Sequence, residues 1–291
     1  MKHSLRLRVG PALFRIGSAW ASPVAALRHL YRDYPEAAGG VADFTVRLQP
    51  SRPWRRYMRP SIFIAGDYWL ADAVPMALRH GLLAAEMGMN LQMALGWRRH
   101  VLLHAATVEK DGRAIILSGE SGSGKSTLAA MLGERGWRLM GDEFALLDLA
   151  NGMVAPFPRP VSLKNAAIDA VGEGVQADRL GPRLAGTAKG DIRHLIPRAD
   201  AIAAMDEPAV PTLILFPRFG APGEARPVEE AECFIRLTQA STNYVALGEA
   251  GFLALTRLVT SVPAIAIDYA SGAEGMAMVE ALWQEQRDMA L

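Results

Sequence analysis

Hydrophobic and polar residues recur along the chain in periods that predict both strands and helices. From residue 5 to residue 9, leucine and valine alternate with arginine, which is typical of a strand with one exposed face, and Gly10-Pro11 ends the pattern. Between Leu82 and Trp97 the apolar residues recur at helical spacing, with Leu83, Met87 and Leu91 on one face. We therefore expect a strand at the start of the chain and an amphipathic helix near residue 90.

A hairpin is predicted around Asp111-Gly112, which lies between the apolar runs 101–108 and 114–117. An Asp-Gly pair between two such runs is a strong signal for a two-residue hairpin turn. With this turn, His104 on the first strand faces Gly119 at the end of the second.

The next segment has the pattern of a βαβ unit: a strand (114–117), a glycine-rich loop, a helix (126–134) that Gly136 terminates, and a strand (137–140). The two strands of such a unit are parallel and end at the same edge of their sheet. We therefore expect Gly119 and Asp142 to lie at one edge.

Later patterns predict a second hairpin at 144–157, with its turn at Asn151-Gly152. They also predict strands at 212–216 and 264–269 and helices at 248–260 and 273–286. The whole is an α/β fold, a mixed sheet with flanking helices and antiparallel additions.

The chain divides near residue 98. Residues 1–98 are richer in Arg, Trp and Pro, and the prolines of the segment PSRPWRRYMRP (50–60) forbid a regular element there. We expect this part to be an α+β region that binds a substrate or partner, and residues 99–291 to be the second domain.

Composition excludes several classes of protein. The 31 basic and 30 acidic residues give a net charge of +1, which argues against a nucleic-acid binder. The chain has one cysteine, Cys233, so it cannot form an internal disulfide, and one cysteine is too few for a structural zinc site. This cysteine content fits a reducing cytoplasm. We expect Cys233 to lie in the core. No apolar run has the ~20 residues of a membrane span. We interpret the basic start as a strand rather than as a targeting peptide.

A phosphate-binding loop follows the strand 114–117. The motif G-x-x-x-x-G-K-[ST] is formed by Gly119, Glu120, Ser121, Gly122, Ser123, Gly124, Lys125 and Ser126, with Thr127 next. Glycines let backbone N–H groups surround phosphate oxygens, the lysine reaches the β- and γ-phosphates, and the serine hydroxyl binds Mg²⁺. The sequence therefore predicts ATP or GTP binding.

Two carboxylates, Asp142 and Glu143, follow the strand 137–140. Motor and transport ATPases usually carry an acid after a later apolar strand, but the strand at 212–216 is followed by Pro217-Arg218. Asp142 and Glu143 can divide phosphoryl transfer, one taking the proton of the acceptor hydroxyl and the other holding Mg²⁺, unless they form only a solvated turn. His104 could bond Asp142 or a phosphate oxygen, although a lone histidine in an apolar strand is commonly a core residue.

Several cations follow this strand and could clamp phosphates; they are Arg159, Lys164, Lys189 and Arg193. Most surface cations are merely solvated. Asn243 and Tyr244 fit a turn as well as a site.

The order of His104, the loop, Arg135-Gly136, Trp137-Arg138-Leu139 and Asp142-Glu143 resembles the catalytic domain of HPr kinase/phosphorylase. This resemblance implies a fold related to phosphoenolpyruvate carboxykinase and ATP-dependent transfer to a serine hydroxyl. It also implies Asp142 as the base, with Lys125, Ser126 and His104 as phosphate and metal partners. The family's E-[IVL]-R-G-x-G signature, tied to the reverse phosphorolysis, is absent, since the corresponding region reads RPVSLKN (159–165).

A longer set of segments is similar to the HprK-related kinase A group. They are H-A-A at 104–106, G-W-R-L-x-x-D-E at 136–143, R-P-x-x-L-K-N at 159–165, K-G-x-x-x-H-L at 189–195, F-P-R at 216–218 and N-Y-x-x-L-G at 243–248. Such proteins are linked with peptide-modification cassettes, which implies a peptide acceptor.

The sequence is compatible with three functions. The first is a Mg²⁺-ATP-dependent serine kinase for a peptide or small protein, with Asp142 as the base, Ser126 and Glu143 at the metal and Lys125 at the phosphates. The others are a small-metabolite kinase and a non-catalytic ATP-gated partner protein. The sequence leaves a homo-oligomer open.

Overall fold

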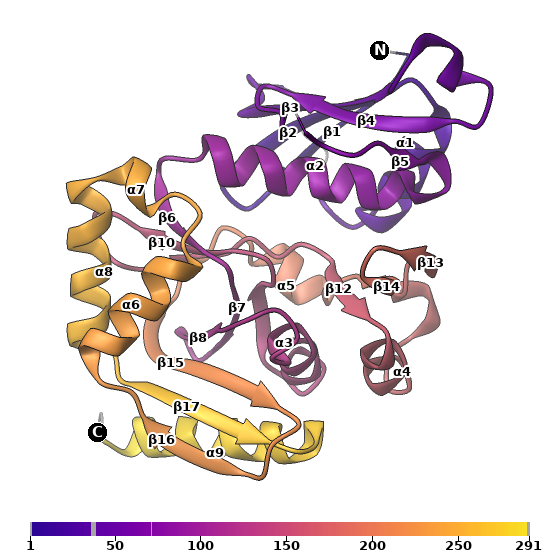
Figure 1. The fold of residues 1–291 in the computed structure, drawn as a ribbon. Helices are drawn as coiled ribbons and strands as arrows, with labels where there is room; N and C mark the ends of the chain where they lie inside the picture. The colour runs from indigo at the N-terminus through magenta and orange to yellow at the C-terminus, as the bar shows by residue number, and fades with distance from the viewer. Residues whose placement is uncertain (1, 36–38, 71, 290–291) are drawn as a thin grey trace.

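The N-terminal part of the chain is a five-stranded sheet covered by two helices. The computed structural model describes residues 2–35, 39–70 and 72–289. The sheet has the order β1-β2-β3-β4-β5, and α1 and α2 pack on one of its faces (Figure 1). The elements are β1 (His3–Val9), β2 (Ala12–Ser18), α1 (Ala21–Leu30), β3 (Phe44–Pro50), β4 (Ser61–Gly66), β5 (Met76–Ala77) and α2 (Gly81–Gly96). The predicted N-terminal strand and the predicted helix at 82–97 are therefore confirmed.

Two details of this region differ from the prediction. The proline-rich segment contains a short 3-10 helix, η1 (Pro53–Arg56), because a proline at the first position of a helix loses no hydrogen bond. A second one, η2 (Leu78–His80), precedes α2.

The prediction of which face of α2 is buried is wrong. Met87 is exposed, whereas Glu86 and Gln92 are buried. The side chain of Gln92 accepts from Tyr68 N at 2.9 Å and donates to Tyr68 O at 2.8 Å. Because distant residues satisfy these polar groups, the buried face does not follow the apolar pattern.

The rest of the chain is built on a six-stranded sheet with the order β16-β17-β15-β8-β7-β9. Its strands are β7 (Ala105–Lys110), β8 (Arg113–Ser118), β9 (Arg138–Gly141), β15 (Val210–Phe219), β16 (Glu224–Pro227) and β17 (Ala264–Tyr269). Strands β8, β15 and β17 are parallel neighbours. Strand β7 is antiparallel to β8, and β16 is antiparallel to β17. The fold is thus the predicted mixed α/β fold.

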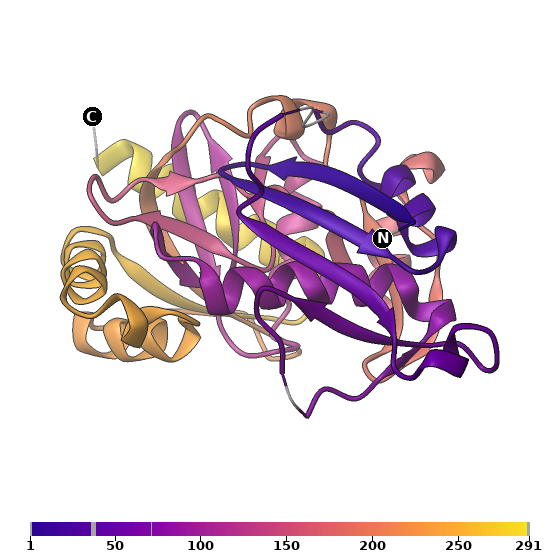
Figure 2. The same cartoon turned by 90° about the horizontal axis from the view of Figure 1, so that it is seen from above.

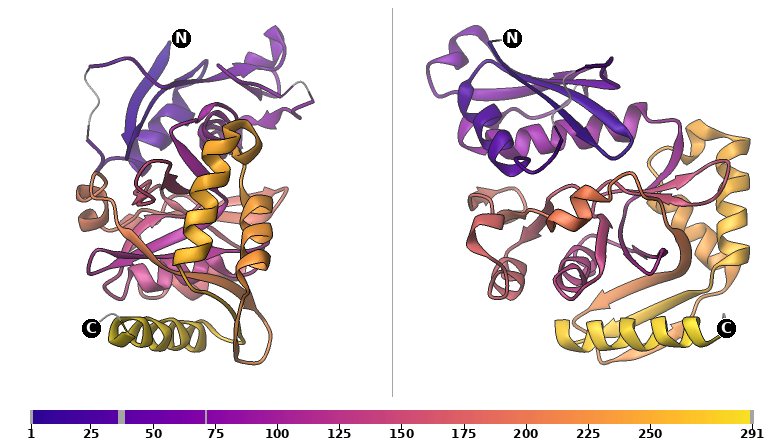
Figure 3. Two further views of the ribbon diagram at one scale, coloured as in Figure 1. Left: turned by 90° about the vertical axis from the view of Figure 1, so that its left-hand side faces the viewer. Right: turned by 180° about the vertical axis from the view of Figure 1, so that it is seen from behind.

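Helices cover both faces of this sheet. The helices α3 (Lys125–Gly133) and α9 (Gly272–Met289) share one hydrophobic cluster with it, and α6 (Glu230–Ala240) and α8 (Glu249–Ser261) share another. Figure 3 shows α9 at the end of the molecule remote from the N-terminal sheet. Cys233 is buried in the second cluster, as predicted.

The hairpin register agrees with the prediction, but its first strand is interrupted. Ala105 pairs with Ser118 and Lys110 with Arg113. The predicted strand 101–108 breaks at His104, since β6 (His100–Leu103) pairs with β10 (Ala145–Asp148) in another sheet. His104 therefore does not pair with Gly119. β8 and β9 run in the same direction, as predicted, but β7 lies between them.

Two small sheets complete the fold. One is β11-β10-β6, whose β10 and β11 (Val154–Ala155) form the predicted second hairpin. The other is β12-β14-β13, formed by β12 (Val161–Lys164), β13 (Leu184–Thr187) and β14 (Gly190–Leu195). The remaining helices are α4 (Ala166–Gly172), η3 (Ala177–Arg179), α5 (Ala199–Ala203) and α7 (Tyr244–Leu247).

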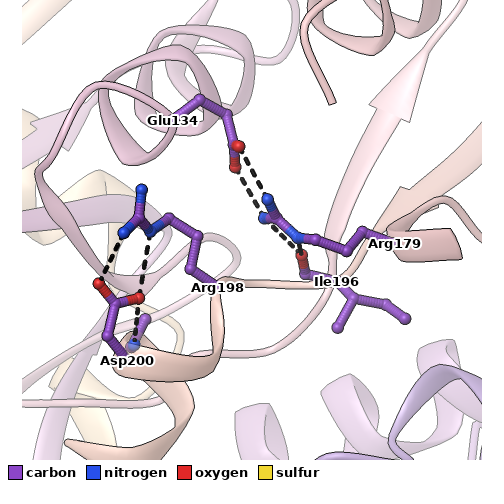
Figure 4. Close-up of polar contacts among 6 residues, drawn as sticks. Glu134, Arg179, Ile196, Arg198 and Asp200 are labelled. Atoms are coloured by element: carbon purple, nitrogen blue, oxygen red, sulfur yellow. Dashed lines mark hydrogen bonds and ion pairs between the residues drawn. The ribbon is translucent and has the colours of Figure 1, made fainter. Parts of the chain in front are cut away.

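An ion pair ties the segment around β12 and β14 to the end of α3. Arg179 donates to both carboxylate oxygens of Glu134, at 2.7 and 2.8 Å, and also to the carbonyl oxygen of Ile196 (Figure 4). Arg198 bonds Asp200 beside it (Figure 4). The chain that returns from β14 is thereby fixed against the C-terminal end of α3.

The N-terminal sheet and the remainder share one hydrophobic core. The cluster that holds Phe14, Ile16 and Met89 also holds Leu102 and Phe157. Figure 2 shows the N-terminal sheet and α2 stacked on the C-terminal elements. The boundary near residue 98 thus crosses a continuous core. Among the described residues, no helix has the length and apolar character needed to span a membrane.

Candidate nucleotide-binding site

The glycine-rich loop runs from the end of β8 to the first turn of α3. Gly124 precedes α3 with φ of 95°, a conformation that glycine adopts without strain. A Cβ at this position would collide with the hydroxyl of Tyr269 and lie 3.2 Å from Cβ of Phe219. The loop therefore needs glycine here both for its backbone and for the space above it.

Lys125 folds back into the loop. Its ammonium donates to the carbonyl oxygens of Gly119 and Glu120, at 2.7 Å each, and its side chain is buried. Burial lowers the pKa of Lys125, and the nearby charges of Asp142 and Glu143 oppose this shift. The lysine is positioned at the mouth of the loop, where the N-terminus of α3 adds positive potential.

Asp142 is a buried carboxylate at the end of β9, with 4% of its surface exposed. Its Oδ2 accepts a long hydrogen bond of 3.4 Å from the Ser162 N–H, while Oδ1 has no hydrogen-bond partner among the described residues. Burial raises the pKa of Asp142 to about 6, the Glu143 charge adds to the rise, and the nearby Ser126 hydroxyl opposes it. This carboxylate can exchange a proton near neutral pH.

His104 contacts Glu143 rather than Asp142. Its Nδ1 lies 3.2 Å from the carbonyl oxygen of Glu143, to which it donates, and 3.8 Å from Oε2. Burial lowers the pKa of His104, while the Glu143 charge opposes that effect. Of the two partners expected for His104, Asp142 is therefore replaced by the neighbouring Glu143, and a phosphate oxygen stays a prediction.

A cavity of about 730 Å³ gathers most of the predicted site residues. A volume in this range suits a nucleotide-sized ligand. From the prediction, the residues that line it are His104, Ser121, Gly122, Gly124, Lys125, Ser126, Thr127, Asp142, Glu143, Lys164 and Lys189.

Two predicted cations lie elsewhere. The guanidinium of Arg159 is buried and forms an ion pair with Glu86 of α2. The Nε of Arg193 donates to the carbonyl oxygen of Gly181 at 2.9 Å. Neither lines the cavity, because each is held by an acceptor in the protein. The side chain of Asn243 is also structural, since it bonds the backbone of Leu102 and His100.

No protein-family model matches the chain. The HPr kinase/phosphorylases of two strains of Treponema pallidum are each 37% identical to it over 73 residues, or 24% of this chain and 23% of each relative. The chain contains an HPr kinase-like segment. The matches span about a quarter of these relatives. The HPr(Ser) kinase/phosphatase from Coxiella burnetii aligns with 63% of this chain and 98% of its own, at 13% identity and a TM-score of 0.28, which is too low to carry an argument.

The sequence prediction missed two aromatic residues beside the glycine-rich loop. Phe219 ends β15 and Tyr269 ends β17, and their rings meet edge to face with centroids 5.7 Å apart. Both line the cavity. Ligands of parallel sheets bind beyond the carboxyl ends of the strands, so the predicted strands at 212–216 and 264–269 already pointed to this wall.

The donor set fits a nucleotide and a divalent cation. Asp142, one of whose oxygens has no partner among the described residues, lines the same cavity as Ser126 and Glu143. Hydroxyl and carboxylate oxygens are the ligands that Mg²⁺ prefers, and it is commonly bound through one or two carboxylates together with substrate phosphates. Ser126, Glu143 and Asp142 can therefore hold this ion.

Proposed function

We propose that the chain is a Mg²⁺-ATP-dependent kinase that transfers the γ-phosphoryl group to a serine hydroxyl of a peptide or small protein. The observation that carries this proposal is the buried Asp142, one of whose oxygens has no partner among the described residues, in the cavity that Lys125 and the phosphate loop also line. Pure nucleotide binding does not require a buried carboxylate with a raised pKa, whereas phosphoryl transfer to a hydroxyl requires a proton acceptor.

In this proposal each residue has a separate task. Asp142 accepts the proton of the serine hydroxyl while the serine oxygen forms a bond to the γ-phosphorus and the bond to the ADP oxygen breaks. Lys125 and the loop N–H groups stabilise the charge of the transferred phosphoryl group. Ser126 and Glu143 hold Mg²⁺, and His104 orients Glu143. When bound, Mg²⁺ neutralises charge on the phosphates.

The name of the similar relatives, HPr kinase/phosphorylase, supports a kinase with a protein acceptor. The region at 159–165 lacks the signature tied to phosphorolysis, so we propose the forward reaction only.

The proposal is tested by incubating the protein and MgATP labelled in the γ-phosphate with separate pools of cell peptides and of small metabolites. We expect label on a serine of the peptide pool, and none with Asp142→Asn. Label confined to the metabolite pool would reject the peptide acceptor. Tight ATP binding with neither transfer nor hydrolysis would favour a non-catalytic ATP-gated protein.

A further inference from the structure

A second and larger hollow lies in the N-terminal part of the protein. This groove has a volume of about 1350 Å³, compared with about 730 Å³ for the nucleotide cavity. Small-molecule sites are commonly ~300–1,000 Å³, so the groove has room for a segment of polypeptide. Its apolar lining includes Pro23, Ala26, Ala77, Leu78, Leu82 and Leu184.

Arginines surround the groove without matching acids. Of its arginines, Arg52, Arg55, Arg59 and Arg79 form no ion pair within the described part of the chain, while Arg183 pairs with Asp191 at 2.9 Å. The sequence contains no acidic residue between Asp43 and Asp67. A local excess of positive charge therefore exists in a chain whose net charge is only +1, and it attracts an anionic partner.

The segment 52–59, which contributes to the groove lining, has the composition of a protein-binding surface. Trp54 is 52% exposed, and the guanidinium of Arg52 lies 5.2 Å from the centre of its ring. Tyr57 and Met58 are exposed in the same segment. Tryptophan, tyrosine, methionine and arginine are the residues enriched at protein interfaces, and the first, second and last supply most of the strong contacts.

One strand connects the groove with the nucleotide cavity. Arg183 and Leu184, at the start of β13, line the groove, whereas Lys189, after the end of β13, lines the cavity. The ring of His80 bonds the carbonyl oxygen of Ala185 at 3.0 Å and fixes β13 to the N-terminal part. An extended chain spans at most ~3.6 Å per residue, so Arg183 and Lys189 lie no more than about 22 Å apart.

We propose that this groove binds an acidic segment of the acceptor polypeptide and so delivers a nearby serine to the nucleotide cavity. The inference rests on the proposed kinase function. The apolar lining favours a segment in which acidic and apolar side chains alternate. A nucleic acid fits less well, because its bases stack on aromatic side chains and Trp54 is the sole aromatic residue lining the groove within the described residues. Its concave shape favours a peptide over a membrane surface.

The test measures peptide binding without ATP, by fluorescence anisotropy. The probe is a short fluorescein-labelled peptide of alternating glutamate and leucine with one serine, compared with a peptide that has lysine in place of glutamate. We expect the acidic probe to bind and the basic probe not to bind. The Arg52→Glu/Arg79→Glu variant should raise the Kd at least about tenfold, because two charge-assisted contacts become repulsive.

The matched control is Arg47→Glu, which changes an exposed arginine of β3 outside the groove. We expect it to leave the Kd unchanged. Arg183→Ala, at another residue that lines the groove, provides a second groove variant. Thermal unfolding curves check that all variants are folded. Equal loss of affinity in the control and groove variants would overturn the proposal. So would failure of the acidic probe to bind, or tighter binding of single-stranded RNA or of phosphatidylserine vesicles than of the probe.

ATP binding and labelled phosphate transfer are measured on the same proteins. Loss of probe binding with ATP binding and ATPase activity retained places the defect in the groove alone. Probe binding by a protein that transfers no phosphate would reject the kinase function while leaving the groove as a peptide site.

Discussion

The guanidinium of Arg159 and the carboxylate of Glu86 form an ion pair in which both side chains are buried. The Nε of Arg159 also donates to the hydroxyl of Tyr31 at 3.2 Å. The pair joins the chain after β11 to α2 of the N-terminal part. A residue expected among the phosphate contacts is therefore part of the junction between the two regions.

Arg159→Ala should destabilise the protein without affecting the nucleotide site. Removing one partner leaves a buried charge unpaired, which lowers the free energy of unfolding by about 3–5 kcal/mol. Urea denaturation measures this loss. The double variant Glu86→Leu/Arg159→Met should recover much of it, since no unpaired charge remains. Weakened ATP binding at unchanged stability would contradict the structural role.

Asp142→Asn should abolish phosphoryl transfer and preserve ATP binding. The amide cannot accept the serine proton, and a positioned base contributes about 10²–10⁴-fold to the rate. Labelled phosphate transfer and calorimetric ATP titration measure the two properties. Transfer at the original rate by the variant would remove Asp142 from the role of base.

The transfer rate should depend on pH through the same carboxylate. Because the pKa of Asp142 is about 6, the base is ionised at pH 8 and becomes protonated as the pH falls below 6. We expect the rate to decrease about tenfold per pH unit in that acidic range. A rate that is constant from pH 5 to pH 8 would show that another group takes the proton.

The same raised pKa means that the ionised form of Asp142 lowers the free energy of unfolding. Its folded pKa of about 6 exceeds the ordinary value of 3.8, so its contribution to stability is favourable below 3.8 and is lost as the pH rises through 6. Asp142→Asn should therefore be more stable than the original protein at pH 8, by roughly 1–3 kcal/mol, and similar to it near pH 3. Urea denaturation at both values measures the difference, and equal stability at pH 8 would contradict the burial argument.

Gly124→Ala should disrupt nucleotide binding. The methyl group would strain a backbone with φ of 95° and collide with the Tyr269 hydroxyl. Gly136→Ala is a matched control, since Gly136 has φ of 91° and no atom within 4 Å of the added carbon. Both variants should lose about 1–2 kcal/mol of stability from backbone strain, but only Gly124→Ala should lose ATP affinity in calorimetric titration. Equal ATP affinity in both would show that the contact with Tyr269 is unimportant.

Local sequence signals predicted local structure well. The Asp111-Gly112 turn was enough to predict the register of β7 and β8, because the position of a two-residue turn fixes which residues of the two strands pair. The glycine-rich loop likewise supplied five of the residues that line the cavity, namely Ser121, Gly122, Gly124, Lys125 and Ser126.

Long-range contacts account for what the sequence did not reveal. The strand break at His104 arises because β6 pairs with β10, which follows in the chain only after β9. The buried face of α2 depends on Arg159, a residue far along the chain that neutralises Glu86. Phe219 escaped notice because β15 continues beyond the apolar run that predicted it.

The continuous core limits how this protein can be recombined with others. Leu102, Phe144, Leu146 and Phe157 all belong to the cluster that contains the N-terminal sheet and α2. A chimera joined near residue 98 would have to match the shapes of these side chains to the N-terminal part of its other parent. Exchange of acceptor specificity between such proteins should therefore succeed more readily by grafting the exposed arginines and Trp54 of the groove than by swapping whole N-terminal regions.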